Sequence, residues 1–222
     1  ILLTCVFSIM RTIQNSLLLL LFCSFSAFAQ ENDFQTWYSA SLNKKIIKKT
    51  NLTVKTGLRL RENSSLSAKQ FTDVKIKRKY YKRISYAVGY RYINRWDIAL
   101  NISNQNRFYA DLYYKNKLSK RFSYAVRNRW QTQGYLYAYK MTLRQKFALD
   151  YNIRKIKLAP AIAIEYFLNL EDGINKLRST IALGYPLSKK LDFELAYRIQ
   201  QEFYVNNPET LFIFEGKLAY DL

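Results

Sequence analysis

The chain has 222 residues, of which 36 are Lys or Arg and 16 are Asp or Glu, and it contains no histidine. The absence of histidine excludes the commonest general base of enzymes, and it excludes metal sites that are built on histidine. Both cysteines, Cys5 and Cys23, lie near the N-terminus, so the rest of the chain cannot be a disulfide-stapled scaffold. The excess of basic residues indicates an anionic partner, such as nucleic acid, a membrane surface or an anionic ligand.

The first 29 residues have the pattern of a secretory signal peptide. Arg11 precedes a continuous apolar run over residues 17–22, and residues 27–29 (A-F-A) supply a cleavage site of the A-x-A type. The run is shorter than the ~20 apolar residues that a membrane-spanning helix needs. We therefore expect residues 1–29 to hold upstream residues and a signal peptide that is removed. Residues 30–222 are expected to form one exported domain.

An alternation of apolar and polar residues begins near residue 34 and continues to the last residue. Successive side chains of a β-strand point to opposite faces, so each such stretch has one apolar and one polar face. Leu58 and Leu60, for example, alternate with Gly57, Arg59 and Arg61. The strands that this pattern predicts span residues 34–42, 51–61, 70–81, 84–94, 106–118, 122–132, 138–151, 156–168, 176–186, 191–203 and 210–222.

The apolar faces of these strands must pack either against one another, as in a soluble β-sandwich, or against lipid. Most of the predicted strands hold about 10–13 residues. Soluble strands usually hold ~5–6 residues, whereas a strand that crosses a membrane needs ~9–11. Aromatic residues make up 16% of the chain and gather near strand ends, where outer-membrane barrels carry aromatic girdles. The pattern therefore favours a closed transmembrane barrel, because an open sheet in lipid would leave backbone groups unpaired.

The connections between the predicted strands are of two kinds. Short basic turns such as Lys82-Arg83 alternate with longer polar loops such as residues 95–105. An outer-membrane barrel has short turns at its periplasmic rim and longer loops at the other. Bacterial barrels have an even number of strands as a rule, whereas the pattern predicts eleven. Either residues 34–42 lie outside the wall, or one strand was missed. We predict an all-β, antiparallel, up-and-down barrel of 10–12 strands in the bacterial outer membrane.

Five short motifs of alternating aromatic and basic residues are arranged in order along residues 30–222. These are Asp33-Phe34 with Trp37, Arg59-Leu60-Arg61, Ala87-Val88-Gly89-Tyr90-Arg91-Tyr92, Arg107-Phe108-Tyr109 and Arg127-Asn128-Arg129-Trp130. In this order and spacing the chain resembles the domain of unknown function 2490 (DUF2490) family of Bacteroidota outer-membrane barrels. The resemblance covers essentially the whole of residues 30–222. It implies an outer-membrane barrel and no activity, because none is known for the family.

Basic residues dominate the polar faces, which a barrel would turn toward its lumen. The candidate lumen residues are Arg59, Arg61, Arg91, Arg107, Arg127, Arg129, Arg144, Arg178 and Arg198. Two interpretations of these arginines remain open. The arginines line a narrow pore or an anion-binding barrel, or they fill the interior of a small barrel as one half of an ion-paired network.

Carboxylates on the same faces leave an enzymatic alternative open. Two carboxylates can perform acid–base chemistry without histidine, although pairing with nearby Arg and Lys is their commoner role. The candidates are Asp73, Asp111, Asp150, Glu165, Asp192 and Glu194. We expect a non-enzymatic barrel with no catalytic residue, no cofactor and no metal site.

The last predicted strand keeps its alternation up to the terminal residue, which resembles the assembly signal of outer-membrane proteins. That signal usually ends in Phe or Trp, and Leu222 takes the place here. The candidate assembly residues are Phe214, Leu218, Tyr220 and Leu222. The expected partners are the barrel-assembly machinery, outer-membrane lipid and lipopolysaccharide. Nucleic acid is not expected, because the aromatic and basic side chains lie on opposite faces and form no stacking groove. A specific protein partner does not follow from the sequence.

Overall fold

Every strand of the structure is hydrogen-bonded on both edges, as a strand in lipid must be. The structure is a computed structural model that describes residues 31–97, 99, 101–136, 138–170, 173–205 and 207–222. The expected signal peptide lies outside these residues. Glu31–Leu222 form one unit. Among the residues described, no helix is long and apolar enough to cross a membrane.

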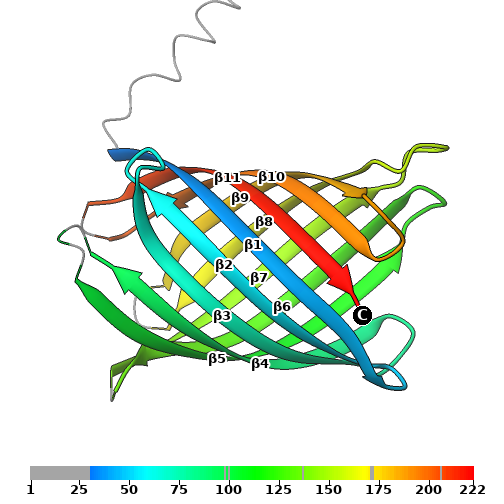
Figure 1. Ribbon diagram of the computed structural model, residues 1–222, viewed down its shortest axis with the longest axis horizontal. Helices are drawn as coiled ribbons and strands as arrows, with labels where there is room; N and C mark the ends of the chain where they lie inside the picture. The colour runs from blue at the N-terminus through cyan, green and yellow to red at the C-terminus, as the bar shows by residue number, and fades with distance from the viewer. Residues whose placement is uncertain (1–30, 98, 100, 137, 171–172, 206) are drawn as a thin grey trace, which may run out of the picture. The chain divides into compact units, whose positions relative to one another are not determined.

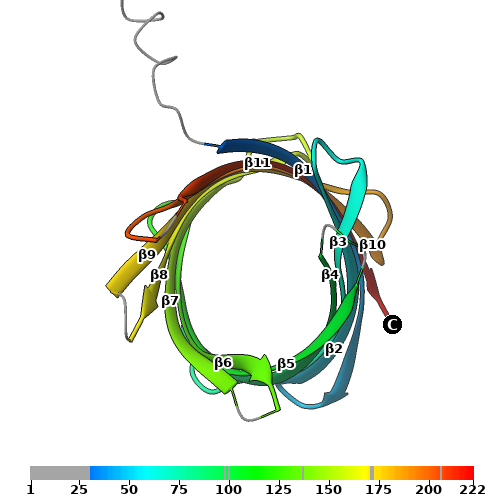
Figure 2. The same ribbon diagram turned by 90° about the vertical axis from the view of Figure 1, so that its left-hand side faces the viewer.

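Eleven strands of the described chain form a closed barrel (Figures 1 and 2). They are β1 (Glu31–Ile47), β2 (Thr50–Arg61), β3 (Leu66–Lys79), β4 (Ile84–Trp96), β5 (Ile102–Lys117), β6 (Phe122–Tyr135), β7 (Ala138–Tyr151), β8 (Ala159–Asn169), β9 (Gly173–Pro186), β10 (Leu191–Glu202) and β11 (Glu209–Asp221). The prediction of a β-barrel is confirmed, and each of the predicted strands occurs.

The barrel closes through a parallel pair. Sequence neighbours pair antiparallel, whereas β1 and β11 run side by side in the same direction, in register from Glu31↔Glu209 to Asn43↔Asp221. An odd number of alternating strands makes this unavoidable, because the first and the last then point the same way. Both sequence-based explanations of the odd count are therefore wrong: residues 34–42 lie in the wall, and no strand was missed.

The two rims of the barrel cannot be told apart by the length of their connections. We name the rim where β11 ends the C-terminal rim, and the opposite rim, where β1 begins, the N-terminal rim (Figure 1). Connections hold two to seven residues at the C-terminal rim and two to six at the N-terminal rim. The predicted difference between short turns and long loops is wrong, because backbone pairing continues through polar residues. Residues 66–69 belong to β3, and Ile102 pairs with Trp96.

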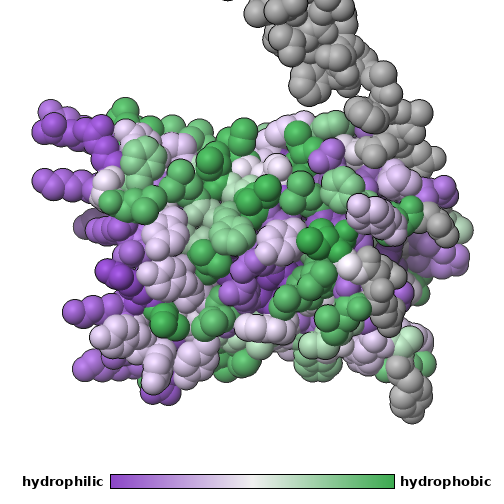
Figure 3. All heavy atoms as spheres, turned by 180° about the vertical axis from the view of Figure 1, so that it is seen from behind, coloured by the Kyte–Doolittle hydropathy of each residue, from purple (hydrophilic) through white to green (hydrophobic). Residues whose placement is uncertain are grey.

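The apolar faces of the strands point outward. Val88 of β4 and Phe108 of β5 are 57% and 50% exposed in the isolated chain. Side chains that face lipid in the membrane have this exposure when the chain is considered without lipid. Figure 3 shows apolar residues spread over the middle of the barrel wall, with strongly polar side chains projecting from its left-hand end, which is the C-terminal rim. Not every aromatic residue faces outward, since the hydroxyl of Tyr113 donates a hydrogen bond to the inward Asp111.

Engineered cysteines report on the closure of the barrel, because a chain that begins at Gln30 contains none. Ser41→Cys with Ala219→Cys places thiols on directly paired residues of β1 and β11. Neighbouring strands lie ~4.8 Å apart, within disulfide range, so we expect a disulfide on oxidation, measured as loss of free thiol. Ser41→Cys with Ala182→Cys, whose second site lies on β9, is the control and should keep its thiols. Free thiols in the first variant would contradict the parallel closure.

Candidate functional site

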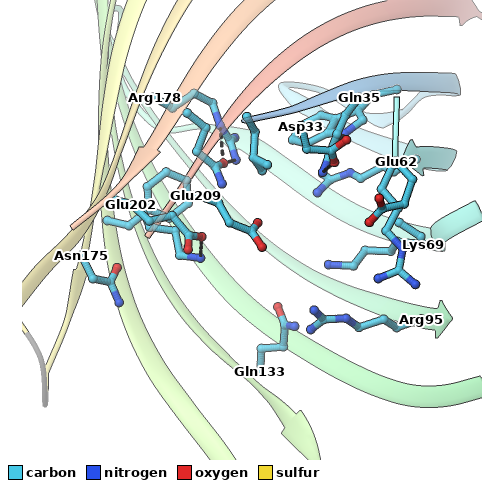
Figure 4. A pocket seen from close by; sticks show the side chains of 18 of the residues that line it. Asp33, Gln35, Glu62, Lys69, Arg95, Gln133, Asn175, Arg178, Glu202 and Glu209 are labelled. Carbon is cyan, nitrogen blue, oxygen red and sulfur yellow. Dashed lines mark hydrogen bonds and ion pairs between the residues drawn. The ribbon is translucent and has the colours of Figure 1, made fainter. Parts of the chain in front are cut away.

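The barrel interior holds two adjoining cavities. The first, of about 890 Å³, lies at the N-terminal rim, where Glu62 and Asn63 contribute to its lining. We call it the vestibule (Figure 4). The second, of about 270 Å³, is the inner cavity, which lies deeper and reaches Lys55 of β2. The two cavities share six lining residues, which are Trp37, Arg59, Arg107, Gln131, Phe167 and Arg178.

The structure places all nine candidate arginines on the lining of these cavities. Arg61 lines the vestibule alone, and three arginines line both cavities, namely Arg59, Arg107 and Arg178. The remaining five line the inner cavity: Arg91, Arg127, Arg129, Arg144 and Arg198. These arginines come from different strands but lie close together, because inward positions of neighbouring strands lie side by side in the barrel wall.

Inward carboxylates accept hydrogen bonds from arginines on the next strand. Asp111 of β5 accepts from both Nε and Nη2 of Arg129 on β6, at 2.6 and 2.7 Å. Asp73 of β3 accepts from Nε of Arg91 at 2.8 Å and from the Tyr109 hydroxyl at 2.8 Å. Charge-assisted bonds with this two-pronged geometry are the strong class of side-chain hydrogen bond. They tie β3 to β4 and β5 to β6 across the lumen face.

Glu165 of β8 gathers three arginines that the sequence separates widely. Its Oε1 accepts from Arg127 at 2.5 Å and from Arg144 at 2.9 Å, and its Oε2 lies 3.4 Å from Nη1 of Arg178. The carboxylate is only 3% exposed. One buried anion therefore partners three cations, which leaves this part of the wall with a surplus of positive charge.

A second ion network lies on β10 and β11. Glu215 accepts from Nε of Arg198 at 2.6 Å, and Nζ of Lys217 lies 3.6 Å from its carboxylate. Lys217 also donates to Glu194 at 2.5 Å. These contacts leave Glu215 and Glu194 each with a basic neighbour.

Ion pairing accounts for most of the carboxylates that left the enzymatic alternative open. Five of the six candidates contact Arg or Lys, and these are Asp73, Asp111, Asp150, Glu165 and Glu194. The sixth, Asp192, is exposed at the beginning of β10. Within the described ranges, no three acidic side chains converge as metal ligands would.

Guanidinium groups stack on a set of inward aromatic rings. The stacked pairs, with the distance from the guanidinium carbon to the ring centroid, are Arg59–Trp37 (3.7 Å), Arg129–Tyr109 (3.8 Å), Arg91–Phe71 (4.1 Å) and Arg144–Phe167 (4.4 Å). Cation–π contacts of this kind contribute roughly 0.5–2 kcal/mol each. They hold the planar groups in fixed orientations along the wall.

Sequence reasoning missed these rings because it assigned aromatic residues to the lipid. A signal was present: Phe71 shares the polar parity of β3 with Lys69 and Asp73, so it is out of phase with the apolar face. The rings also need space on the neighbouring strand. A Cβ at Gly57 would lie 2.5 Å from the Phe71 ring, and one at Gly89 would lie 2.3 Å from the Tyr109 ring. Glycine at these positions lets the rings lie flat against the wall.

Cations outnumber acids in both cavities. The inner cavity is lined by twelve Lys and Arg and by three Asp and Glu. The vestibule is lined by seven basic and four acidic residues. Lys69 and Arg95, which lie outside the nine predicted arginines, belong to the vestibule. Several donors lack partners among the described residues, since Nε and Nη2 of Arg61 and Nε of Arg127 are buried without a hydrogen bond.

The candidate assembly residues lie on the outer surface of the last strand. Phe214, Leu218 and Tyr220 are exposed on β11, and Leu222 follows the strand, with its backbone N–H donating to the carbonyl of Asn43 at 2.8 Å. This bond ties the end of the chain to β1. Recognition of these residues by the assembly machinery stays a prediction.

The chain is similar to known proteins in two comparisons. The family model described as protein of unknown function (DUF2490) matches residues 34–210. Among solved structures, the NanC porin in a rhombohedral crystal form has a TM-score of 0.50 at 10% identity, over 75% of this chain and 86% of that one. This likeness shows that the chain shares the barrel fold of that porin.

Two structures of a second porin are more distant. The KdgM porin in complex with disordered oligogalacturonate has a TM-score of 0.47 at 14% identity, over 78% of this chain and 98% of that one. The KdgM porin alone has a TM-score of 0.43 at 14% identity, over 78% and 99%. Among curated proteins, no sequence matches this chain.

Glu165→Gln tests the three-arginine network. The change removes a buried anion and leaves Arg127, Arg144 and Arg178 without their carboxylate, so we expect a loss of about 3–5 kcal/mol in the free energy of unfolding. Urea unfolding of the refolded barrel measures this loss, and heat-modifiable migration on gels reports the folded fraction at each urea concentration. Glu194→Gln, a more exposed carboxylate that contacts Lys217, is the control and should cost about 1 kcal/mol or less. Equal costs would contradict the central role of Glu165.

Proposed function

The chain belongs to the family described as protein of unknown function DUF2490, and we propose that it is a non-enzymatic outer-membrane channel that passes small anions. One observation carries the proposal: twelve basic and three acidic residues line the inner cavity. An anion that enters this layer meets an excess of positive charge, whereas a cation is repelled.

The unpaired arginines favour passage over a purely structural role. Arg59 stacks on Trp37, and Arg107 donates to the amide oxygen of Gln133. Within the described residues neither forms a salt bridge with a carboxylate, although both line the vestibule and the inner cavity. A network that served only to fill the lumen would be expected to neutralise its buried charges, because unpaired buried cations are costly.

The inward positions toward the C-terminal rim support a continuous path. On three strands the residues that follow the cationic layer in this direction are small and half-buried, namely Ala125, Ala148 and Ala163. Small side chains leave the cross-section of a narrow barrel to water and mobile lysines. The filled, non-conducting barrel is the alternative, and conductance separates the two.

Planar-bilayer recordings of the barrel of residues 30–222 test the channel. In a KCl gradient we expect discrete conductance steps and a reversal potential that reports preference for chloride. The double variant Arg59→Gln with Arg107→Gln should lower the chloride-to-potassium permeability ratio severalfold, because it removes two cations without an acidic partner. Lys120→Gln, in the exposed β5–β6 connection, is the control and should leave the ratio unchanged. No conductance above background would overturn the channel, and an unaltered ratio would overturn the role of the arginines.

A further inference from the structure

A row of cations crosses the first strands of the barrel inside the vestibule. Arg59 of β2 and Lys69 of β3 are direct cross-strand partners, and Lys69 is in turn the partner of Arg95 on β4. All three line the vestibule, and Figure 4 shows Lys69 and Arg95 extending into it. Like charges placed directly opposite each other destabilise a sheet. This row is therefore maintained at a cost to the fold.

Arg107 of β5 extends the row into a cluster. The positive charges of Arg59, Arg107, Arg95 and Arg91 are the ones that act most strongly on the Lys69 ammonium. Only Arg91 among these is joined to an acid, by its bond to Asp73. We call Arg59, Lys69, Arg95 and Arg107 the vestibule cluster.

No salt bridge neutralises the vestibule cluster within the part of the chain that the structure describes. The acids of the vestibule lie at the N-terminal rim. Asp33 accepts hydrogen bonds from Gln35 and from the backbone of Asn63, and Glu202 is bonded to Lys176. Glu62 and Glu209 complete the acids that line the vestibule, where seven basic residues outnumber the four acidic ones.

Arg61 adds independent evidence for a missing ligand. It lies two residues beyond Arg59 on the same face of β2 and lines the vestibule. Its Nε and Nη2 are buried and have no hydrogen-bond partner among the described residues. Nearly all buried donors in proteins form a hydrogen bond, to the protein itself, to water or to a ligand. The unsatisfied edge of Arg61 therefore indicates an acceptor that the described residues do not supply.

We propose that the vestibule cluster, with Arg61, is a saturable binding site for a multivalent oxyanion of the phosphate class. This deepens the proposed function by naming the kind of anion that the channel admits. A tetrahedral dianion has enough acceptor oxygens and enough charge to engage several guanidinium and ammonium groups at once. Chloride has too little charge for the cluster and offers no oxygen geometry to the arginine fork. The vestibule, at about 890 Å³, admits both free phosphate and a phosphate group carried by a small solute.

Isothermal titration of the folded barrel in a phosphate-free buffer tests the site. We expect saturable binding of inorganic phosphate that persists when chloride at matched ionic strength is present. Lys69→Gln with Arg95→Gln should weaken binding at least tenfold. The control is Lys140→Gln, an exposed cation of β7 that lines neither cavity and lies outside the C-terminal rim, and it should bind as the parent does. Heat-modifiable gel migration verifies that each variant is folded.

Two further results bear on the inference. Binding that disappears at matched ionic strength, or that is equal in the double variant and the control, would overturn it. Titration of glycerol 3-phosphate beside inorganic phosphate tells whether an ester or the free ion is preferred, and tighter binding of either supports the phosphate class. Because titration does not involve conductance, a barrel that binds phosphate without conducting overturns the channel alone. A chloride-selective channel without saturable phosphate binding overturns this inference alone.

A second inference concerns the C-terminal rim, where exposed cations form a ring. They are Lys44, Lys45, Lys48, Lys49, Arg78, Lys79, Lys82, Arg83, Lys115, Lys117, Lys120, Arg121, Arg154, Lys155, Lys157, Lys189 and Lys190. The described acids of this rim are Asp150, Asp192 and Asp221, and Asp150 is bonded to Lys115. Figure 3 shows the long polar side chains of this ring projecting from the left-hand end of the barrel.

The position of this ring matches the headgroup layer of a membrane. It borders the apolar outer wall, and exposed aromatic residues such as Tyr80, Tyr81 and Tyr220 lie at the same level. Tyrosine prefers the interface between hydrocarbon and headgroups, and basic side chains there attract anionic lipid. We infer that the ring binds the phosphate headgroups of anionic membrane lipids.

Native mass spectrometry of barrels released from vesicles that hold equal amounts of phosphatidylglycerol and phosphatidylcholine tests this ring. We expect retained lipid to be mostly phosphatidylglycerol. The variant Lys82→Gln/Arg83→Gln/Lys189→Gln/Lys190→Gln should retain at least threefold less of it, whereas Lys69→Gln with Arg95→Gln, which changes the vestibule, should not differ from the parent. Equal retention of the two lipids, or no loss in the rim variant, would overturn the inference.

Discussion

The constraint on which this structure depends is that a strand in lipid can leave no backbone hydrogen bond unmade. A sheet of eleven strands satisfies it only by returning to its first strand, and eleven is odd, so the joining pair is parallel. The parallel pairing runs from residue 31 to residue 43 of β1. A backbone hydrogen bond from Leu222 to Asn43 holds the end of the chain against β1. β1 is therefore part of the wall and cannot be treated as a leader to it.

Closure has a second consequence, because it brings every polar face to one interior. Eleven inward faces rich in arginine and lysine would repel one another if they were left bare. The barrel relieves this in two ways: carboxylates such as Glu165 join cations from several strands, and aromatic rings such as Trp37 provide faces on which guanidinium groups stack. Both devices neutralise charge only in part. The surplus that remains around Arg59 and Arg107 is the basis of the proposed anion passage.

Basic side chains have one proposed role inside the barrel and another at the C-terminal rim. Inside, the vestibule cluster is built from adjacent strands whose register sets the spacing of its cations. At the C-terminal rim, the cations lie in turns and at strand ends and are exposed. Fixed spacing suits a discrete ligand with several oxygens, whereas a ring of flexible, hydrated side chains suits a layer of headgroups.

The alternation of residues predicted the strands, and together with the strand lengths and the aromatic residues at strand ends it predicted the barrel. It then placed arginines such as Arg91 and Arg198 on the lumen face. These properties follow from the two-residue period of a strand, which is local. The parallel closure, the equal connections at the two rims and the inward Phe71 and Tyr109 were decided by the tertiary structure. So were the partners of Glu165, which come from β6, β7 and β9. The physical reason is that register and closure are set by hydrogen bonds between strands distant in the chain, and these determine which charges meet.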